Sequence, residues 1–466
     1  MSSGPSAGPS GATAPPPTQT SSFAGLPKLT AAFLTSTYTA EAAILRLLFA
    51  GKVLSERGDA EGEACLQAGL TLVTTTTHNA KWFRDFRSAL GNPVSASDAW
   101  LSDAEEGAKA AVAHVEARLS ESRAAGESRA AQRALWRELA DAYMSSGGWK
   151  NAQRAAIRAR DFGGTANKAN SFDDIVAIIR AVVPSRDLGP ILSLAAKVRS
   201  SPSDQNADSL GADPLAVVKG KIRAAGGLAH MSMRSYKAAA RGFLDVAPGI
   251  EDAFSSVLSM ADIALYGALT ALASFDRVEL KGLLNSPSFK PFLELVPVVR
   301  DIVADFYDCN YHASLSALTN IRDRLELDVH LAPHIESLYS SIRSKALIQY
   351  FSPFSTVDLA RMADAFSSSV EGISEEVAAL IVQGDIQARI DAENGILIAS
   401  QDDLRSSTFS AALKTGAAFE RQSKALLLRV RMAQAGFAVS SPNAKAGKPG
   451  VGRKSKDTTH QRKKKR

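Results

Sequence analysis

Cysteine is almost absent from this chain, because only Cys65 and Cys309 occur among its 466 residues. Two thiols are too few for a disulfide framework or a thiolate zinc site, so we expect a reducing intracellular compartment. No apolar run reaches the ~18 residues that a membrane-spanning helix needs, and we expect no membrane association. The first residues are rich in Ser, Gly, Pro and Thr and lack the basic start and apolar stretch of a signal peptide.

Catalytic signatures are missing as well. None of the seven histidines belongs to the HExxH or HxH patterns that hold catalytic zinc. His330 and His334 stand on either side of Pro333, and we interpret them as surface or helix-capping residues. Lys448 lies in a Gly-Lys-Pro-Gly segment that resembles a phosphate-binding loop, but neither Ser nor Thr follows it. A GxSxG match occurs at residues 4–8, but it lies in the N-terminal segment predicted to be disordered rather than on a strand-to-helix turn. With no Cys-His motif either, we expect no enzyme activity, no metal and no cofactor.

Net positive charge is confined to the C-terminal end. Residues 441–466 hold ten Lys or Arg and one Asp, a net charge of +9, so the first 440 residues carry −3 of the total of +6. A body slightly below neutrality argues against a nucleic-acid-binding core. The final cluster predicts a nuclear localisation signal and a protein found in nucleus and cytoplasm, with a nucleic-acid-binding patch and a solubilising tail as alternatives. Its residues are Arg462, Lys463, Lys464, Lys465 and Arg466.

Between two tails predicted to be disordered, residues 1–27 and 441–466, the apolar residues recur almost everywhere with a helical period. Three stretches open on an aromatic residue, and small or apolar residues follow at similar offsets. They are Trp149 with Ala152 and Ala156, Tyr236 with Ala239 and Phe243, and Tyr311 with Leu315 and Leu318. This pattern suits paired helices of a tetratricopeptide-like solenoid, so residues 28–255 predict a helical-repeat domain. A non-repeating helical bundle is the alternative.

Residues 327–399 predict a winged helix on a helical stem. Apolar residues share one face over residues 335–350, and Pro353 sets the end of that helix. Ser355 with Asp358 predicts a capping-box start for the next helix. A helix-turn-helix of this kind is common in nucleic-acid-binding proteins, but it also serves in protein assemblies.

The third helix of this module is acidic. We expect it to begin at Ser374, with Glu375 and Glu376 in its first turn, and to end at Gly384. No Lys or Arg follows before Arg389. A recognition helix brings its first turns to base edges beside phosphates, where two carboxylates would repel DNA. The module is therefore expected to bind protein, and nucleic acid is not an expected partner.

A β-hairpin wing follows, around an Asn394-Gly395 turn, which is the strongest local hairpin signal. We expect an edge of its sheet to dock a strand of a neighbouring chain and place Ile396 on that edge, where a substitution by Pro would remove a donor. An edge covered only by water is the alternative. The residues predicted to bind partners on the wing are Arg389, Ile390, Gly395, Ile396, Leu397 and Ile398.

Residues 404–440 predict a helix with a single apolar seam. A small residue, Gly416, lies within the seam and permits close approach of another helix. The helix either enters a bundle with partner subunits or packs back onto its own chain. The seam residues predicted to bind partners are Phe409, Leu413, Phe419, Leu426 and Val430.

Several segments together resemble the PCI-domain family, in particular its subunits of the COP9 signalosome. The resemblance covers residues 38–435 and is carried by 158–162, 236–241, 266–277, 292–295, 299–302 with 306–307, and the stretch from Leu331-Ala-Pro-His334 to Tyr-Phe-Ser-Pro353. It implies a mainly α fold: helical repeats, a PCI domain over 256–403 with a winged helix, and a C-terminal helix.

The same resemblance implies a non-catalytic scaffold in the complex that removes the ubiquitin-like modifier Nedd8 from cullins. The wing 389–398 and the helix 409–432 would then meet other subunits, through winged-helix edges and a helical bundle, with cullin-RING ligases as further partners. A subunit of the proteasome regulatory-particle lid is the nearest alternative. A nuclear nucleic-acid-binding protein that uses the basic tail is an alternative of a different class.

Overall fold

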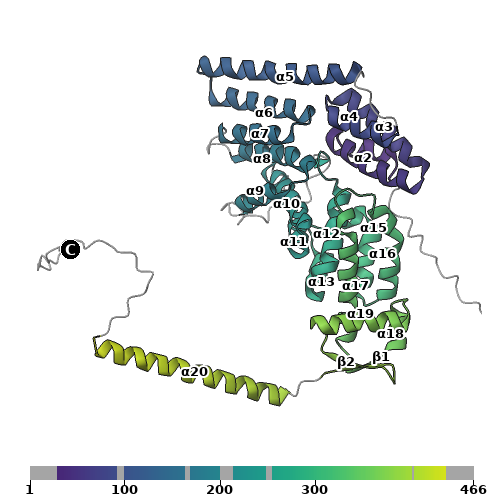
Figure 1. Ribbon diagram of the computed structural model, residues 1–466, viewed down its shortest axis with the longest axis vertical. Coiled ribbons are helices and arrows are strands. Elements are labelled where there is room, and N and C mark those ends of the chain that lie inside the picture. Colours follow the sequence, from purple (N-terminus) through teal and green to yellow (C-terminus); the bar gives the residue numbers. More distant parts are fainter. Residues whose placement is uncertain are drawn as a thin grey trace, which may run out of the picture. The chain divides into compact units, whose positions relative to one another are not determined.

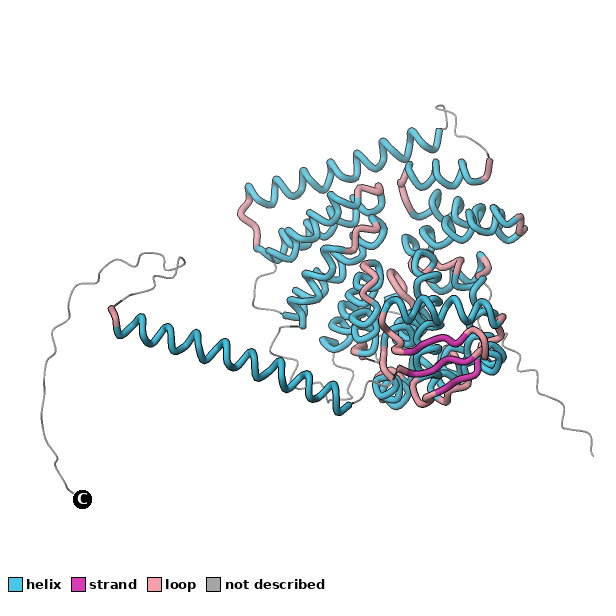
Figure 2. The backbone as a smooth tube through the Cα atoms, turned by 60° about the horizontal axis from the view of Figure 1, so that its bottom comes forward, coloured by secondary structure: helices cyan, strands magenta, loops and turns pink. Residues whose placement is uncertain are grey.

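The computed structural model describes residues 29–91, 99–162, 168–199, 214–247, 254–400 and 404–436. The chain divides into two compact units, one up to Ala399 and one from Ser400 onward. The first unit is helical except for a small sheet near its end (Figures 1 and 2). The predicted mainly α fold, with repeats that precede a winged helix, is confirmed. Both predicted tails lie outside the described residues.

Four helices at the N-terminal end enclose a core of their own. Gly69 packs so closely against the ring of Phe86 that a Cβ atom at this position would collide with it. The buried side chains of Leu47, Leu66 and Phe86 fill the centre of this core. The helices are α1 (Ala31–Thr37), α2 (Ala40–Arg57), α3 (Ala60–Thr76) and α4 (Ala80–Ala89).

The next helices form the repeat array, in which α5 to α8 are stacked in sequence order (Figure 1). The helices predicted to open at Trp149 and Tyr236 begin at these residues. Buried small residues such as Ala152 and Ala156 allow neighbouring helices to approach closely. The elements are α5 (Ala99–Ala124), α6 (Arg129–Ser145), α7 (Trp149–Phe162), α8 (Lys168–Val182), the 3₁₀ turn η1 (Val183–Ser185), α9 (Gly189–Arg199), α10 (Pro214–Ser232) and α11 (Tyr236–Leu244).

A stem of helices then leads to the sheet. Its central helix α12 is buried on nearly all sides, and Gly267 lets the ring of Phe289 pack against the helix backbone. The third predicted opening, at Tyr311, is also confirmed. The elements are α12 (Met260–Ser274), α13 (Arg277–Asn285), α14 (Lys290–Leu295), α15 (Pro297–Tyr307), α16 (Tyr311–Leu325), the 3₁₀ turn η4 (Ala332–His334) and α17 (Ile335–Phe351).

A buried polar network joins the N-terminal helices to the stem. The Asp262 carboxylate accepts hydrogen bonds from the Tyr38 hydroxyl at 2.7 and 2.8 Å and from Arg46 Nη2 at 2.9 Å. The Arg46 guanidinium also lies 4.0 Å from the centre of the Tyr38 ring. One turn along α12, the Tyr266 hydroxyl donates to Asp328 at 2.7 and 2.8 Å. Each buried charge therefore has a partner, as buried charges require.

The winged helix follows the stem, and α18 and α19 lie between the stem and the sheet (Figure 1). The sheet has the strand order β1-β3-β2 with antiparallel neighbours, visible as three adjacent strands in Figure 2. Leu397 is fully buried at the centre of β3 and anchors the sheet on the helices. The elements are β1 (Thr356–Asp358), α18 (Leu359–Ala365), α19 (Val370–Gln383), β2 (Ala388–Asp391) and β3 (Ile396–Ala399).

The structure corrects two predicted helix starts in this module. Asp358 alone caps α18, through a hydrogen bond from the Ala360 N–H, and the residues before it form strand β1 rather than a capping box with Ser355. The acidic helix begins earlier than predicted, because Ser369 is its N-cap and Ser374 lies inside it. Gly384 ends this helix as predicted.

The second unit contains α20 (Leu404–Gln434), which confirms the predicted C-terminal helix. Among the residues that the structure describes, no helix is long and apolar enough to cross a membrane.

Candidate protein-docking surfaces

The sheet of the winged helix has two edges, β1 and β2, and β3 lies between them. Arg389 and Ile390 are on the edge strand β2, in accord with the prediction of an edge. The prediction that Ile396 lies on an edge is wrong, because Ile396 pairs with Asp358 on one side and Asp391 on the other. A proline at position 396 would remove a backbone N–H from the central strand of the sheet. The substitution would therefore destabilise the fold itself and cannot test docking alone.

Side-chain burial divides the predicted wing residues further. Arg389 and Ile398 are exposed, whereas Ile390 and Ile396 are partly buried. The side chain of Leu397 has no exposed surface. We therefore reassign Leu397 from partner contact to the core of the winged helix.

The turn between β2 and β3 is held by Asp391. Its carboxylate accepts hydrogen bonds from the side chain of Asn394 and from the N–H groups of Asn394 and Glu393, and these bonds lower the pKa of Asp391. Gly395 has a φ of 64°, which supplies the left-handed residue that such a turn needs. The conformation of the loop at the tip of the wing is therefore fixed by its own hydrogen bonds.

A pocket of about 430 Å³ lies beside the edge strand β1 and was not foreseen from the sequence. Phe354 lines it and is 50% exposed, next to the ring of Tyr350 at 6.0 Å between ring centres. Ile396 and Arg361 also contribute to its wall. An apolar pocket next to an unpaired strand edge suits the binding of an added strand from another protein. The main-chain hydrogen bonds along the edge would give affinity, and the pocket would select a side chain of the added strand.

The acidic helix α19 presents carboxylates without balancing cations of its own. Glu371 and Glu375 are exposed, whereas Glu376 accepts hydrogen bonds from Arg343 of α17 at 2.8 and 3.0 Å. One of the two predicted first-turn carboxylates is therefore structural. The exposed pair still opposes the approach of a phosphate backbone.

The seam of α20 is exposed along the whole helix. The exposed fraction of its side chains runs from 45% at Val430 to 71% at Phe419. Leu427 and Leu428 are exposed too and widen the apolar surface. All five predicted seam residues lie on this helix, and with Leu427 and Leu428 they form an extended exposed apolar surface.

His330 and His334 were predicted to be surface or helix-capping residues. His334 occupies the N-cap position of α17, although its side chain makes no capping hydrogen bond, and it does not lie on the surface. His334 is buried, and the ring Nε2 of His330 is buried without a hydrogen-bond partner. Burial, together with the nearby Arg46 cation, lowers the pKa of His330 to about 3. Burial also lowers the pKa of His334. Both rings belong to the packed base of the stem.

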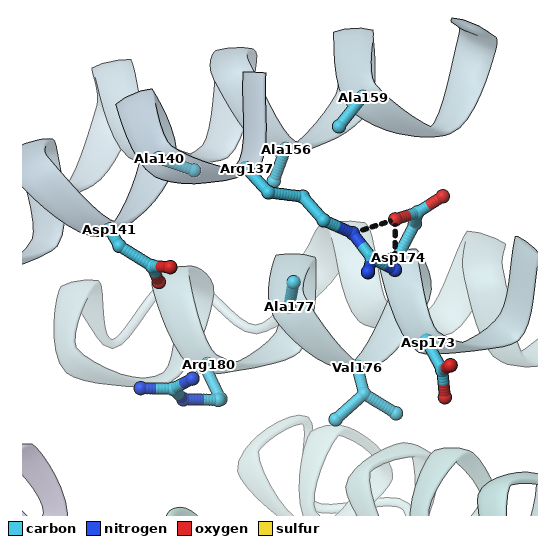
Figure 3. A pocket seen from close by; sticks show the side chains of 10 residues that line it. All are labelled: Arg137, Ala140, Asp141, Ala156, Ala159, Asp173, Asp174, Val176, Ala177 and Arg180. Carbon is cyan, nitrogen blue, oxygen red and sulfur yellow. Dashed lines mark hydrogen bonds and ion pairs between the residues drawn. The ribbon is translucent and has the colours of Figure 1, made fainter. Parts of the chain in front are cut away.

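The repeat array carries grooves that sequence patterns did not reveal. Figure 3 shows one of them, where Arg137 of α6 points to Asp174 of α8. The buried Asp174 carboxylate accepts hydrogen bonds from Arg137 Nε at 2.6 Å and from Arg133 Nε at 2.9 Å. Burial raises the pKa of Asp141 in the same groove. Both arginines of this groove are paired with carboxylates of the chain, Arg137 with Asp174 and Arg180 with Glu41 of α2, which indicates a structural role.

Two family profiles match the chain. The profile described as PCI domain matches residues 310–401, and the profile described as 26S proteasome subunit RPN7 matches residues 97–283. The first match covers the end of the stem and the winged helix, and the second covers the repeat array and the start of the stem. Residues 310–401 therefore match a PCI domain, and a helical-repeat region precedes them.

Within that class the chain is similar to subunit 1 of the COP9 signalosome, as the resemblance in the sequence predicted. COP9 signalosome complex subunit 1 of Arabidopsis thaliana is 42% identical over 298 residues, 64% of this chain and 65% of that protein. Subunit 1b of Drosophila melanogaster is 39% identical over 311 residues, 66% of this chain and 58% of that protein. The alignments thus span less than two thirds of these relatives.

The chain is also similar to a proteasome subunit, at lower identity. The 26S proteasome non-ATPase regulatory subunit 6 homolog of Arabidopsis thaliana is 27% identical over 199 residues, 42% of this chain and 51% of that protein.

Proposed function

We propose that this chain is a non-catalytic scaffold subunit of a COP9 signalosome, the complex that removes Nedd8 from cullins and so regulates cullin-RING ubiquitin ligases. The similarity to signalosome subunit 1 supports the choice of complex. The observation that carries the scaffold role is the exposed apolar seam of α20. In this reading, the isopeptidase chemistry belongs to another subunit.

A helix such as α20 needs other helices around it. It has 31 residues, a length of about 46 Å at 1.5 Å per residue, and exposes Phe409, Leu413, Phe419 and Leu426 to solvent. Most helical stability in proteins comes from packing of an apolar face rather than from helix propensity. Helices of several subunits that share their seams in one bundle would bury all of this surface at once.

The winged helix supplies a second contact. Strands β1 and β2 each leave one side of the sheet unpaired, and β1 borders the pocket lined by Phe354. Neighbouring PCI subunits that add a strand to either edge would form hydrogen bonds with the unpaired backbone N–H and C=O groups there. Because the two contacts lie in separate units of the chain, one subunit can hold several neighbours.

The decisive experiment is native mass spectrometry of the tagged protein purified from its own cells. Co-purification with a zinc isopeptidase and other PCI-domain subunits, together with removal of Nedd8 from a cullin, supports the proposal. The isolated chain should have no such activity. A preparation that contains no other subunit would reject the scaffold role.

Paired substitutions on α20 test the bundle. Phe419→Asp with Leu426→Asp places two charges on the seam, and Ala418→Asp with Ala425→Asp places two charges at the same spacing on the opposite face. We expect the first pair to lose most of the co-purifying subunits and the second pair to retain them. Equal retention by both pairs would show that the seam is not the contact.

A proteasome lid subunit is the second candidate, and the match of residues 97–283 to the RPN7 profile favours it. The same purification distinguishes a signalosome subunit from a proteasome lid subunit. If the chain belongs to the lid, the co-purifying subunits will be those of the proteasome. Identity to the signalosome relative is higher, 42% against 27%, over a longer alignment, which is why we place the signalosome first.

We also propose that the protein occurs in nucleus and cytoplasm and that Arg462, Lys463, Lys464, Lys465 and Arg466 direct nuclear import. These residues lie outside the described part of the chain, and their sequence alone supports the proposal. Deletion of residues 441–466 should shift a fluorescent fusion toward the cytoplasm. If the deletion instead abolished a salt-dependent binding of DNA or RNA, the nucleic-acid alternative would be supported.

A further inference from the structure

A second groove of the repeat array differs in its charges from the groove in Figure 3. It lies over α6, between α5 and α7, and has a volume of about 370 Å³. Three arginines line it, Arg123 from α5 and Arg154 and Arg158 from α7. Leu119 and Tyr143 are among its less polar lining residues. We call it the arginine groove.

Trp136 of α6 forms part of the groove lining. Its ring is covered by two guanidinium groups, with the central carbon of Arg158 at 4.9 Å from the ring and that of Arg123 at 5.2 Å. The indole Nε1 is buried and has no hydrogen-bond acceptor. A buried donor without an acceptor is uncommon in proteins, and it marks a place where an acceptor is missing.

The arginines of this groove also lack anionic partners. Among the described residues, no carboxylate forms an ion pair with Arg123, Arg154 or Arg158. The one carboxylate in the lining, Glu116, accepts a hydrogen bond from Tyr143 at 2.8 Å. In the groove of Figure 3, by contrast, Arg137 is paired with Asp174. Within the described residues, the guanidinium groups of these three arginines therefore have no anionic partner, and the indole N–H of Trp136 has no acceptor.

We propose that the arginine groove binds an acidic, extended peptide segment of another protein, with carboxylates two residues apart on the side of the peptide that faces the groove. Arg154 and Arg158 are one turn apart on the same face of α7, so their Cβ atoms are about 6 Å apart. Alternate side chains of an extended strand are about 7 Å apart, which fits one carboxylate to each arginine.

The fork of a guanidinium matches a carboxylate with two parallel hydrogen bonds. The buried indole N–H of Trp136, which has no acceptor, is a further donor in the groove lining. The apolar lining, which includes Leu119, favours a peptide over an inorganic anion. This site is on the repeat array, and it is independent of the docking surfaces of the wing and of α20.

Binding of a defined probe to the full chain tests the proposal. The probe is a fluorescein-labelled peptide with two Glu-Leu-Glu repeats, and the same peptide with Gln in place of Glu is its control. Fluorescence anisotropy should show saturable binding of the acidic peptide that weakens as salt increases. We expect the Gln peptide to bind at least about 10-fold more weakly, which corresponds to the loss of charge-assisted hydrogen bonds.

Two variants with the same charge change locate the site. Arg154→Glu with Arg158→Glu should weaken binding of the acidic peptide at least about 10-fold, whereas Lys109→Glu with Lys150→Glu, outside the groove on α5 and α7, should leave it within about twofold. Trp136→Phe keeps a ring under the guanidiniums but removes the N–H, and we expect an intermediate loss. Circular dichroism melts confirm that each variant is folded.

Equal loss in the two double variants would mean non-specific charge attraction and would overturn the proposal. Equal binding of the Glu and Gln peptides would do the same. A single-stranded oligonucleotide that binds more tightly than the peptide, with the same dependence on Arg154 and Arg158, would reassign the groove to phosphate-bearing ligands.

Discussion

At the scale of single residues, the buried pair of Arg46 and Asp262 is the contact whose loss we expect to cost most. The Arg46 side chain is 4% exposed, so its replacement would leave the Asp262 carboxylate buried without its cation. Breaking a buried ion pair in this way costs roughly 3–5 kcal/mol. Arg46→Met should therefore lower the urea midpoint strongly.

The surface pair of Arg118 and Glu138 is the matched control for this prediction. Their side chains are 45% and 52% exposed, and such pairs contribute roughly 0–1 kcal/mol. Urea unfolding followed by circular dichroism compares Arg46→Met with Arg118→Met. Similar midpoints for both variants would show that the network does not hold the N-terminal helices on the stem.

A second prediction at this scale concerns pH and His330. The folded state holds its pKa at about 3, below the ordinary value of 6.5, so the unfolded chain binds more protons between these values. Stability is therefore complete above pH 6.5 and falls as the pH decreases toward 3, by roughly 1.4 kcal/mol per pH unit from this group. Arg46, Arg186 and Asp262 are the charged groups that act on the ring.

Replacement of His330 by Gln should reduce the dependence of stability on pH. His334, whose pKa is also lowered, should account for part of the remaining dependence. Thermal melts at pH 7.5, 6.5, 5.5 and 4.5 measure the effect. His114→Gln, at an exposed position on α5, is the control. An unchanged slope in His330→Gln would contradict the assignment.

At the scale of elements, the edge strand β1 and its pocket give a prediction that separates docking from folding. Phe354 is half exposed, so Phe354→Asp should change the thermal midpoint of the chain little while it weakens the co-purification of a neighbouring subunit at least about 10-fold. Val382→Asp, at a still more exposed apolar position on α19, is the control. If both variants retain all subunits, the β1 edge is not a docking surface.

Elements with local signals were predictable from the sequence. Gly384 ends α19 in a left-handed conformation, and Gly395 is the left-handed residue of the hairpin loop, because glycine tolerates the backbone geometry needed there. Trp149 and Tyr236 open helices because the small residues that follow them form a packing face.

Other features depend on contacts between distant residues and left no local trace. Strand β1 has only three residues, and its partner β3 lies about 40 residues further on, so no pattern within it indicates a strand. Ser369 and Ser374 are equally suitable as the N-cap of α19 by residue type. The turn before α19, in which Ser367 has a φ of 51°, places the start of the helix at Ser369. The arginine groove was not foreseen because Arg123, Trp136 and Arg158 come from three helices.

At the scale of the whole molecule, a deletion of the second unit distinguishes the two roles left open for α20. The hydrophobic cores of the first unit consist of residues up to Ala399, so this unit should fold without the second. We expect deletion of residues 404–466 to leave the thermal midpoint within about 2 °C, because a chain of this size shifts by only a few degrees per kcal/mol. The same deletion should abolish co-purification of the other subunits. A large drop in the midpoint with assembly preserved would instead mean that α20 packs back onto its own chain, and the subunit contacts would then have to lie on the winged helix alone.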